Sequence, residues 1–261
     1  MDYRNLCENV CRIAGEAGDF IARQRLTFSF DRVEHKGAQD LVSYVDKETE
    51  KMVVKELREL LPEAGFITEE GTVEKATGQR YKWVIDPLDG TTNFVHGLAP
   101  YCVSLALTED DKPVVGVVYE VTHKECFYAW KDSAAYLNGR EIRASTIGTL
   151  TDSLIGMGLS HASDDSIPEL LRHMDYFLRH TNGVRRLGSA AADLAYVACG
   201  RFDGFYQKNL SPWDVAAGAL IARQAGARVT DFAGGDNYVF GREIIASNSS
   251  IYDSFRQRIL D

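Results

Sequence analysis

The stretch that most constrains this chain runs from Trp83 to Phe94, with the sequence WVIDPLDGTTNF. An apolar run typical of a buried strand ends at Asp86, and a second acid, Asp89, follows three residues later. The proline between the acids fixes its own φ, and Gly90 can take a positive φ, so we expect a sharp turn here. After such a turn, both carboxylates and the carbonyl of Leu88 can face one point.

The residues after this turn favour a second kind of site. Thr91 and Thr92 occupy the position at which a helix N-cap is expected. The N–H groups of residues 90–92 would then point outward and form an anion site. Asp-Pro and Asp-Gly are also ordinary turn dipeptides, so the motif alone is equally compatible with a plain surface turn.

Two further acidic positions resemble the first in their setting. Glu69 follows the short apolar run 65–68, although a solvated loop carboxylate is the simpler interpretation. Asp214 lies in the first turn of an apolar helix that begins with Ser211, where the simpler interpretation is that the acid completes a capping box. If these two acids converge with those of the turn, each pair ~4 Å apart repels by ~4 kcal/mol at an effective dielectric of ~20. Hard divalent cations such as Mg²⁺ relieve this repulsion, and they would also let an acidic protein bind a phosphate dianion.

Composition limits the class of protein. The chain has 261 residues, 45% of them hydrophobic, and a net charge of −9, so we expect a soluble protein with a sizeable core and no nucleic-acid partner. The five cysteines include no CxxC pair and indicate free thiols in a reducing compartment. No secretory signal or membrane span is expected, so the predicted location is cytoplasmic.

Hydrophobic periodicity predicts an α/β fold. An N-terminal lobe, about residues 1–145, combines two helices with a run of strands, including a hairpin at Asn138-Gly139. A C-terminal lobe, about residues 146–261, alternates strands and helices within the same single domain. The expected helices cover about 6–21, 45–61, 167–180, 189–199, 211–224 and 251–260; the expected strands cover 65–68, 82–85, 101–107, 114–119, 125–130, 153–157, 184–187, 204–206 and 244–246.

Five blocks of this sequence, in order, resemble the inositol monophosphatase family of Mg²⁺-dependent, lithium-sensitive phosphatases. With Lys36 before them and Gly226 after them, they span residues 36–226: DLVSYVD from Asp40, ITEE from Ile67, DPLDGTTNF from Asp86, LGSAA from Leu187 and WDVAAG from Trp213. The resemblance implies the layered α-β-α-β-α sandwich of the sugar phosphatases, a homodimer, and hydrolysis of a phosphate monoester with two or three Mg²⁺ ions. Inositol-1-phosphate is the expected substrate.

The resemblance also implies a ligand set. The first Mg²⁺ is expected on Glu69, Asp86 and the Leu88 carbonyl. The second is expected on Asp86, Asp89 and Asp214, and a third, looser ion is expected to reach Glu69 through water.

The catalytic and substrate contacts follow from the same resemblance. Thr91, paired with Asp46, is expected to orient the attacking water, and the amides of Gly90 and Thr91 are expected to hold the phosphate. Two metal ions clamp the attacking and leaving oxygens of such a displacement, so no histidine acid is required. The residues expected to face the substrate are Gly188, Ser189, Ala190 and Gln207.

Two positions depart from the family pattern. Gln207 stands where many members have an acid that binds inositol hydroxyls, and a neutral amide makes weaker hydrogen bonds than a carboxylate. Selectivity for inositol is therefore open. Lys36 is offset by one residue relative to Asp46, and it either holds a metal-bound water or the phosphate or plays no part.

Three other functions stay open within this fold. A nucleotide 3′-phosphatase, a fructose-1,6-bisphosphatase and a histidinol phosphatase would use the same metal site. A non-catalytic regulator that binds a macromolecular partner is a further alternative, because one fold can carry unrelated functions. Loss of metal ligands would favour the regulator, and the sequence retains all of them.

Overall fold

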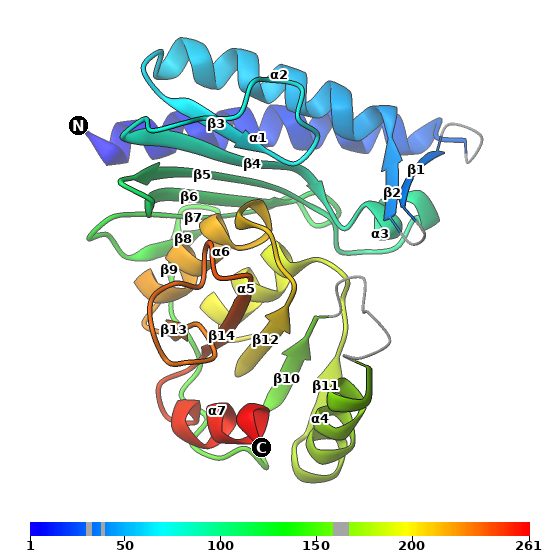
Figure 1. Cartoon of the computed structure of the whole chain (residues 1–261), viewed down its shortest axis with the longest axis vertical. Helices are drawn as coiled ribbons and strands as arrows, with labels where there is room; N and C mark the ends of the chain where they lie inside the picture. Colours follow the sequence, from blue (N-terminus) through cyan, green and yellow to red (C-terminus); the bar gives the residue numbers. More distant parts are fainter. Residues whose placement is uncertain (30–32, 38–39, 159–166) are drawn as a thin grey trace.

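In the computed structural model, which describes residues 1–29, 33–37, 40–158 and 167–261, the larger of two mixed sheets has seven strands in chain order (Figure 1). β3 and β4 are parallel, and every later neighbouring pair is antiparallel. The strands are β3 (Gly65–Thr68), β4 (Tyr81–Asp89), β5 (Cys102–Glu109), β6 (Lys112–Glu120), β7 (Glu125–Trp130), β8 (Ala135–Leu137) and β9 (Arg140–Ile142).

Helices cover both faces of this sheet, which explains its long apolar runs. α1 (Tyr3–Leu26) and α2 (Tyr44–Leu60) pack on one face, against side chains such as Trp83 and Ile85. The alternate residue, Val84, packs on the opposite face with the alanine-rich helices α5 (Ala190–Ala198) and α6 (Pro212–Gln224). α6 approaches the sheet so closely that a Cβ on Gly116 would lie 2.8 Å from the carbonyl oxygen of Ala217.

The second sheet has five strands in the order β11-β10-β12-β14-β13. Its outer face packs on α4 (Ile167–His180) and α7 (Tyr252–Leu260). The strands are β10 (Leu154–Met157), β11 (Gly183–Arg185), β12 (Gly204–Lys208), β13 (Arg228–Thr230) and β14 (Glu243–Ser247). The layers thus alternate as helix, sheet, helix, sheet and helix, and the predicted α-β-α-β-α sandwich is confirmed (Figure 1).

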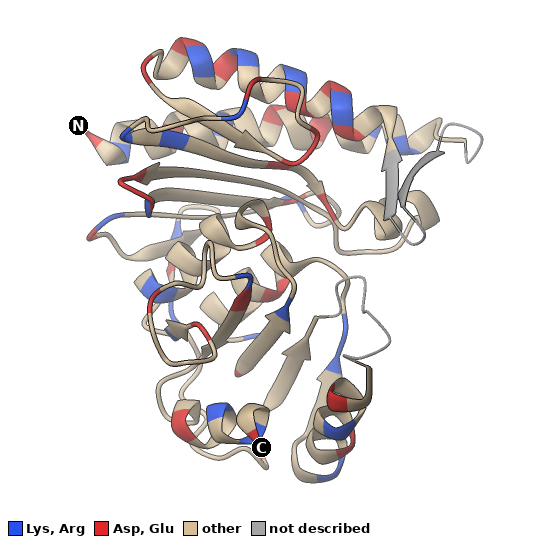
Figure 2. Cartoon of the chain, viewed as in Figure 1, with Lys and Arg blue, Asp and Glu red and all other residues tan. Residues whose placement is uncertain are grey.

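A small region beside the end of β4 completes the fold. It consists of the antiparallel pair β1 (Val33–Gly37) and β2 (Asp40–Ser43) and the short helix α3 (Thr91–His96). Figure 2 shows acidic and basic residues interspersed along α1 and α2, in keeping with an exposed helix face. None of the described helices combines the length and the apolar character that a membrane crossing requires.

Candidate functional site

A bulge at the end of β4 brings two carboxylates to one side of the strand. Asp86 lies opposite Ser104 and Asp89 lies opposite Cys102, so three residues along β4 match two along β5. In a regular strand, side chains three residues apart point to opposite faces, and the extra residue of a bulge reverses the second one. Asp86 also accepts a hydrogen bond from the N–H of Leu88 (3.0 Å), which lies within the bulge.

Glu69, Asp86, Asp89 and Asp214 converge at this strand end. Burial raises the pKa of Asp86 well above its usual range, and the nearby charges of the other three acids raise it further. The carboxyl groups of Glu69 and Asp86 lie within hydrogen-bonding reach, which two ionised groups tolerate only with a proton or a cation between them. Burial likewise raises the pKa of Asp214, with added repulsion from Asp89 and Glu69.

Asp214 also caps its own helix. One carboxylate oxygen accepts a hydrogen bond from the N–H of Ser211 (2.6 Å), as the capping box predicts. The start of α6 is fixed to the sheet, because Ser104 donates a hydrogen bond to the carbonyl of Trp213 (3.1 Å). Ser104 faces Asp86 across the ladder, so the helix cap holds Asp214 beside Asp86. Capping and membership of the acidic cluster are therefore compatible.

Asp89 is held by the start of α5. Its Oδ2 accepts hydrogen bonds from the Ser189 hydroxyl and the Ala191 N–H, both at 2.7 Å. Burial raises the pKa of Asp89 to about 6, and these hydrogen bonds limit the rise. The Ser189 hydroxyl also accepts a hydrogen bond from the N–H of Ala192 (3.2 Å), so it joins the helix cap to the acidic cluster.

The helix after the turn begins one residue earlier than the sequence suggested. The N-cap of α3 is Gly90, with φ 92°, and not Thr91 or Thr92, which lie within the helix. Glycine is required here because a Cβ would be strained at this φ and would lie 3.1 Å from the carbonyl oxygen of Pro100. Gly90 offers no side chain to the first turn of α3, whose N–H groups are left without a side-chain cap.

Thr91 connects this turn to α2. Its hydroxyl lies 3.0 Å from Asp46 Oδ1 and 3.0 Å from the carbonyl oxygen of Leu88. The other oxygen of Asp46 accepts hydrogen bonds from the N–H (2.8 Å) and the hydroxyl (2.7 Å) of Ser43, the N-cap of α2. Burial raises the pKa of Asp46, and the Ser43 and Thr91 contacts oppose that rise. Asp46 is therefore a helix cap and the partner of Thr91.

The donor set at this strand end fits a hard cation. It consists of four carboxylates and the nearby carbonyl of Leu88, which are the oxygen ligands that Mg²⁺ prefers. Burial and repulsion from the other acids of the cluster raise the pKa of Asp86 and of Asp214. A divalent cation bound among these carboxylates would therefore stabilise their ionised forms strongly.

The remaining predicted residues lie around this cluster or on the second sheet. Gly188, with φ 88°, and the buried Ala190 flank Ser189, and the Gly188 carbonyl lies against Gly90. Gln207 lies in β12, with only 8% of its surface exposed, and packs against Gly158. Lys36 lies in β1, and its side chain is outside the described residues.

Asn93 has a role that sequence reasoning missed. Its side-chain amide donates hydrogen bonds to the carbonyl of Pro100 (2.8 Å) and to that of Leu187 (2.7 Å). It thus fastens α3 to the segment that leads into Ser189. The DGTTN motif contained this residue, but no local pattern identifies Leu187, 94 residues away, as its partner.

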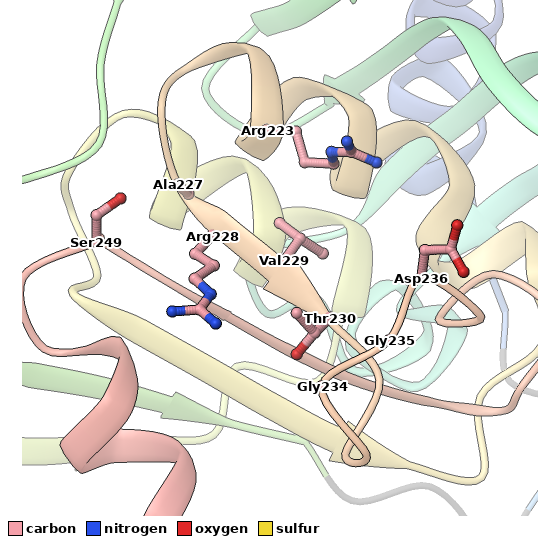
Figure 3. Close-up of a pocket in the computed structure, with 9 residues that line it drawn as sticks. All are labelled: Arg223, Ala227, Arg228, Val229, Thr230, Gly234, Gly235, Asp236 and Ser249. Atoms are coloured by element: carbon pink, nitrogen blue, oxygen red, sulfur yellow. The ribbon is translucent and has the colours of Figure 1, made fainter.

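One surface pocket lies on different residues from this cluster. It has a volume of about 650 Å³ and lies along β13, where Arg223, Arg228, Asp236 and the loop of Gly234 and Gly235 line it (Figure 3). Its arginines have partners of their own, because Arg223 donates a hydrogen bond to Tyr238 and Arg228 donates one to Asp253. We therefore assign the chemistry to the acidic cluster and not to this pocket.

Comparison with known proteins gives matches across nearly the whole chain. The sequence model of the inositol monophosphatase family matches residues 2–260. The chain is 37% identical to an inositol-1-monophosphatase from Rhizobium meliloti (94% of this chain, 92% of that protein) and 38% identical to the Nus factor SuhB of Escherichia coli K12 (96% and 94%). A crystal structure of the suppressor protein SuhB from Bartonella henselae superposes with a TM-score of 0.90 at 36% identity, covering 98% of both chains.

Proposed function

The chain belongs to the inositol monophosphatase family, and from this premise we propose that it is a Mg²⁺-dependent phosphate monoester hydrolase that converts inositol-1-phosphate to inositol and phosphate. The convergence of Glu69, Asp86, Asp89 and Asp214 at the end of β4 carries the proposal. These acids come from three separate segments. Asp86 is buried and the other three are half-buried, so an ionised cluster here requires cations.

In this proposal Glu69, Asp86 and the Leu88 carbonyl hold one Mg²⁺, and Asp86, Asp89 and Asp214 hold a second. A third, looser ion would reach Glu69 through water. Bound Mg²⁺ would supply the charge that attracts the phosphate dianion, lowers the pKa of water and stabilises the leaving alkoxide. The protein contributes a set of ligands that hydrogen bonds keep in place, among them those of Ser189 and Ser211.

Thr91 and Asp46 would orient the attacking water. A hydroxyl has one proton and two lone pairs, so a Thr91 that donates to Asp46 can accept a hydrogen bond from water. The Gly90 and Thr91 amides would bind phosphate oxygens at the start of α3, which has no side-chain cap. Gly188, Ser189 and Ala190 would border the substrate.

The identity of the ester is the finer part of the proposal. Gln207 offers inositol an uncharged amide, so the same site also suits other small phosphate esters, including sugar bisphosphates, nucleotide 3′-phosphates and histidinol phosphate. Phosphate release measured over a matrix of these esters with Mg²⁺, Mn²⁺, Ca²⁺ or EDTA tests it. We expect Mg²⁺-dependent turnover that is highest with inositol-1-phosphate and inhibited by lithium; turnover that persists in EDTA would contradict the metal mechanism.

A second candidate function rests on the SuhB relatives. Several relatives at about the same identity as the phosphatase are named Nus factors, so this chain is also a candidate for a Nus-factor role, in which it would bind a macromolecular partner. Because both metal positions keep their carboxylates, we rank the phosphatase first. A protein that releases no phosphate from any ester with any metal would favour the second function.

The assembly and location are further parts of the proposal. We propose a homodimer in the cytoplasm, with no nucleic acid or membrane as partner. Light scattering on the purified protein would give the mass of the assembly, and a monomer at micromolar concentration would contradict the dimer.

A further inference from the structure

Another buried carboxylate, Glu50, binds the segment that follows Glu69. Glu50 is on α2, one turn after Asp46, and none of its surface is exposed. A fully buried glutamate is unusual unless it has partners, because burial of an unpaired charge is costly. The partners of Glu50 lie twenty residues further along the chain, in the segment that follows β3.

The Glu50 carboxylate anchors that segment by accepting three short hydrogen bonds. One oxygen accepts the N–H of Glu70 (2.7 Å), and the other accepts both the N–H and the hydroxyl of Thr72 (2.7 Å each). Bonds of this kind to a charged acceptor are about twice as strong as those between neutral groups. Between the two anchored residues, Gly71 takes a positive φ of 64° that lets both N–H groups face the carboxylate.

Together with a bond from Glu69 itself, these bonds fix the backbone on both sides of that residue. The N–H of Glu69 itself donates to the carbonyl of Ile85 (3.2 Å), the residue before Asp86, and so continues the ladder between β3 and β4. The next N–H along the chain, that of Glu70, donates to Glu50. The carboxylate of Glu69 therefore projects from a backbone tied at one point to the strand of Asp86 and at the next to the helix of Asp46.

We propose that Glu50 is a positioning residue for the metal site: it holds Glu69 at the distance from Asp86 that Mg²⁺ binding requires. The inference rests on the proposed function, since it assigns Glu69 to a metal. Mg²⁺ demands near-ideal octahedral geometry, so displacement of one ligand weakens binding. Loss of a residue that supports a ligand typically costs ~10–100-fold in metal affinity.

Glu50→Gln tests this role with little change in volume. Glutamine keeps one acceptor oxygen, but its NH₂ group would face an N–H of Glu70 or Thr72, donor against donor. Calorimetric titration without substrate should show Mg²⁺ binding ~10–100-fold weaker than in the wild type. In the assay the half-saturating Mg²⁺ concentration should rise in parallel, with kcat regained at saturating Mg²⁺.

Asp203→Asn is the matched control. Asp203 is also buried, and it accepts hydrogen bonds from the N–H of Leu154 (2.7 Å) and the hydroxyl of Ser145 (2.5 Å). It directly precedes β12 of the second sheet, whereas the acidic cluster lies at the end of β4 in the first sheet. Its replacement should lower the melting temperature and leave Mg²⁺ affinity unchanged.

Three outcomes would overturn the inference. If Glu50→Gln binds Mg²⁺ as tightly as the wild type, or if Asp203→Asn weakens binding equally, the positioning role is wrong. If Glu50→Gln fails to fold by circular dichroism, Thr72→Val removes one of the three bonds alone, and unchanged Mg²⁺ affinity in that variant overturns the inference. A wild type that binds Mg²⁺ and hydrolyses no ester would refute the proposed function while the Glu50 comparison still stands.

Discussion

Replacement of Ser189 by alanine tests how the acidic cluster is built. The hydroxyl is buried, caps α5 through Ala192 and donates to Asp89 at 2.7 Å. Loss of a helix cap costs about 1 kcal/mol. Loss of a hydrogen bond to a charged group costs about 1.5–3 kcal/mol. The free energy of unfolding should therefore fall by about 3 kcal/mol, and at about 2–4 °C per kcal/mol for a chain near this size the melting temperature should fall by about 6–12 °C.

The assay is thermal unfolding in EDTA at pH 7.5, where Asp89 is largely ionised and metal occupancy plays no part. Asp2→Ala is the control, because Asp2 caps α1 through one exposed hydrogen bond to the Asn5 N–H (3.1 Å). That change should cost only about 1 kcal/mol. A Ser189→Ala variant no less stable than Asp2→Ala would refute the reasoning. An increase in KM without loss of stability would instead favour direct contact between Ser189 and substrate.

Three further predictions concern catalysis, metal and substrate. Thr91→Val should lower kcat by ~10²–10³-fold, because the hydroxyl that orients water is lost. Mg²⁺ binding measured by calorimetry should be unchanged, because the carboxylates remain. An unchanged kcat would show that Thr91 has no part in the mechanism. In the folded protein the pKa of Asp89 is raised to about 6 from its usual ~3.9. Between these two pH values the folded metal-free protein therefore binds more protons than the unfolded chain. Its stability should fall as the pH rises through that window. The gain in melting temperature with Mg²⁺ over EDTA should then be larger at pH 7.5 than at pH 5, and equal gains would contradict this linkage. Gln207→Glu should raise turnover of inositol-1-phosphate relative to the other esters, and an unchanged order of preference would dismiss the contact.

Local sequence patterns predicted most elements of the fold. The α2 helix and its end, the strand before Asp86 and the helix after Ser211 all follow from apolar spacing and capping residues. The hairpin at Asn138-Gly139 is confirmed, since both residues take positive φ and Leu137 pairs with Arg140. These features depend on neighbours in the chain, which is why the sequence reveals them.

Features that depend on distant partners were predicted less well. The sequence placed the turn directly after Asp86, whereas β4 continues through a bulge to Asp89, because pairing with β5 extends the strand. The threonines were expected to cap α3, but close packing against Pro100 requires glycine at that position. β13 was not predicted, since it has only three residues and its pairing with β14 defines it.

The site shows the same division. The motif around Asp86 indicated a metal, and the family resemblance named the four acids, yet neither showed what holds them. Glu50 reads as an ordinary helix residue until its bonds to Glu70 and Thr72 are seen. The sequence predicts Ser189 as a helix cap and a substrate contact, and only the fold shows that its hydroxyl donates a hydrogen bond to Asp89.

Calorimetric titration of Mg²⁺ into the wild type and Asp214→Asn tests the central claim most directly. Asp214 is the cluster member most distant in sequence from Glu69, and asparagine can still accept the Ser211 N–H, so the helix cap is retained. The account predicts that the wild type binds at least two Mg²⁺ per chain and that the variant loses one of them together with phosphate release. Equal stoichiometry and affinity in the two proteins would show that these acids do not form one metal site.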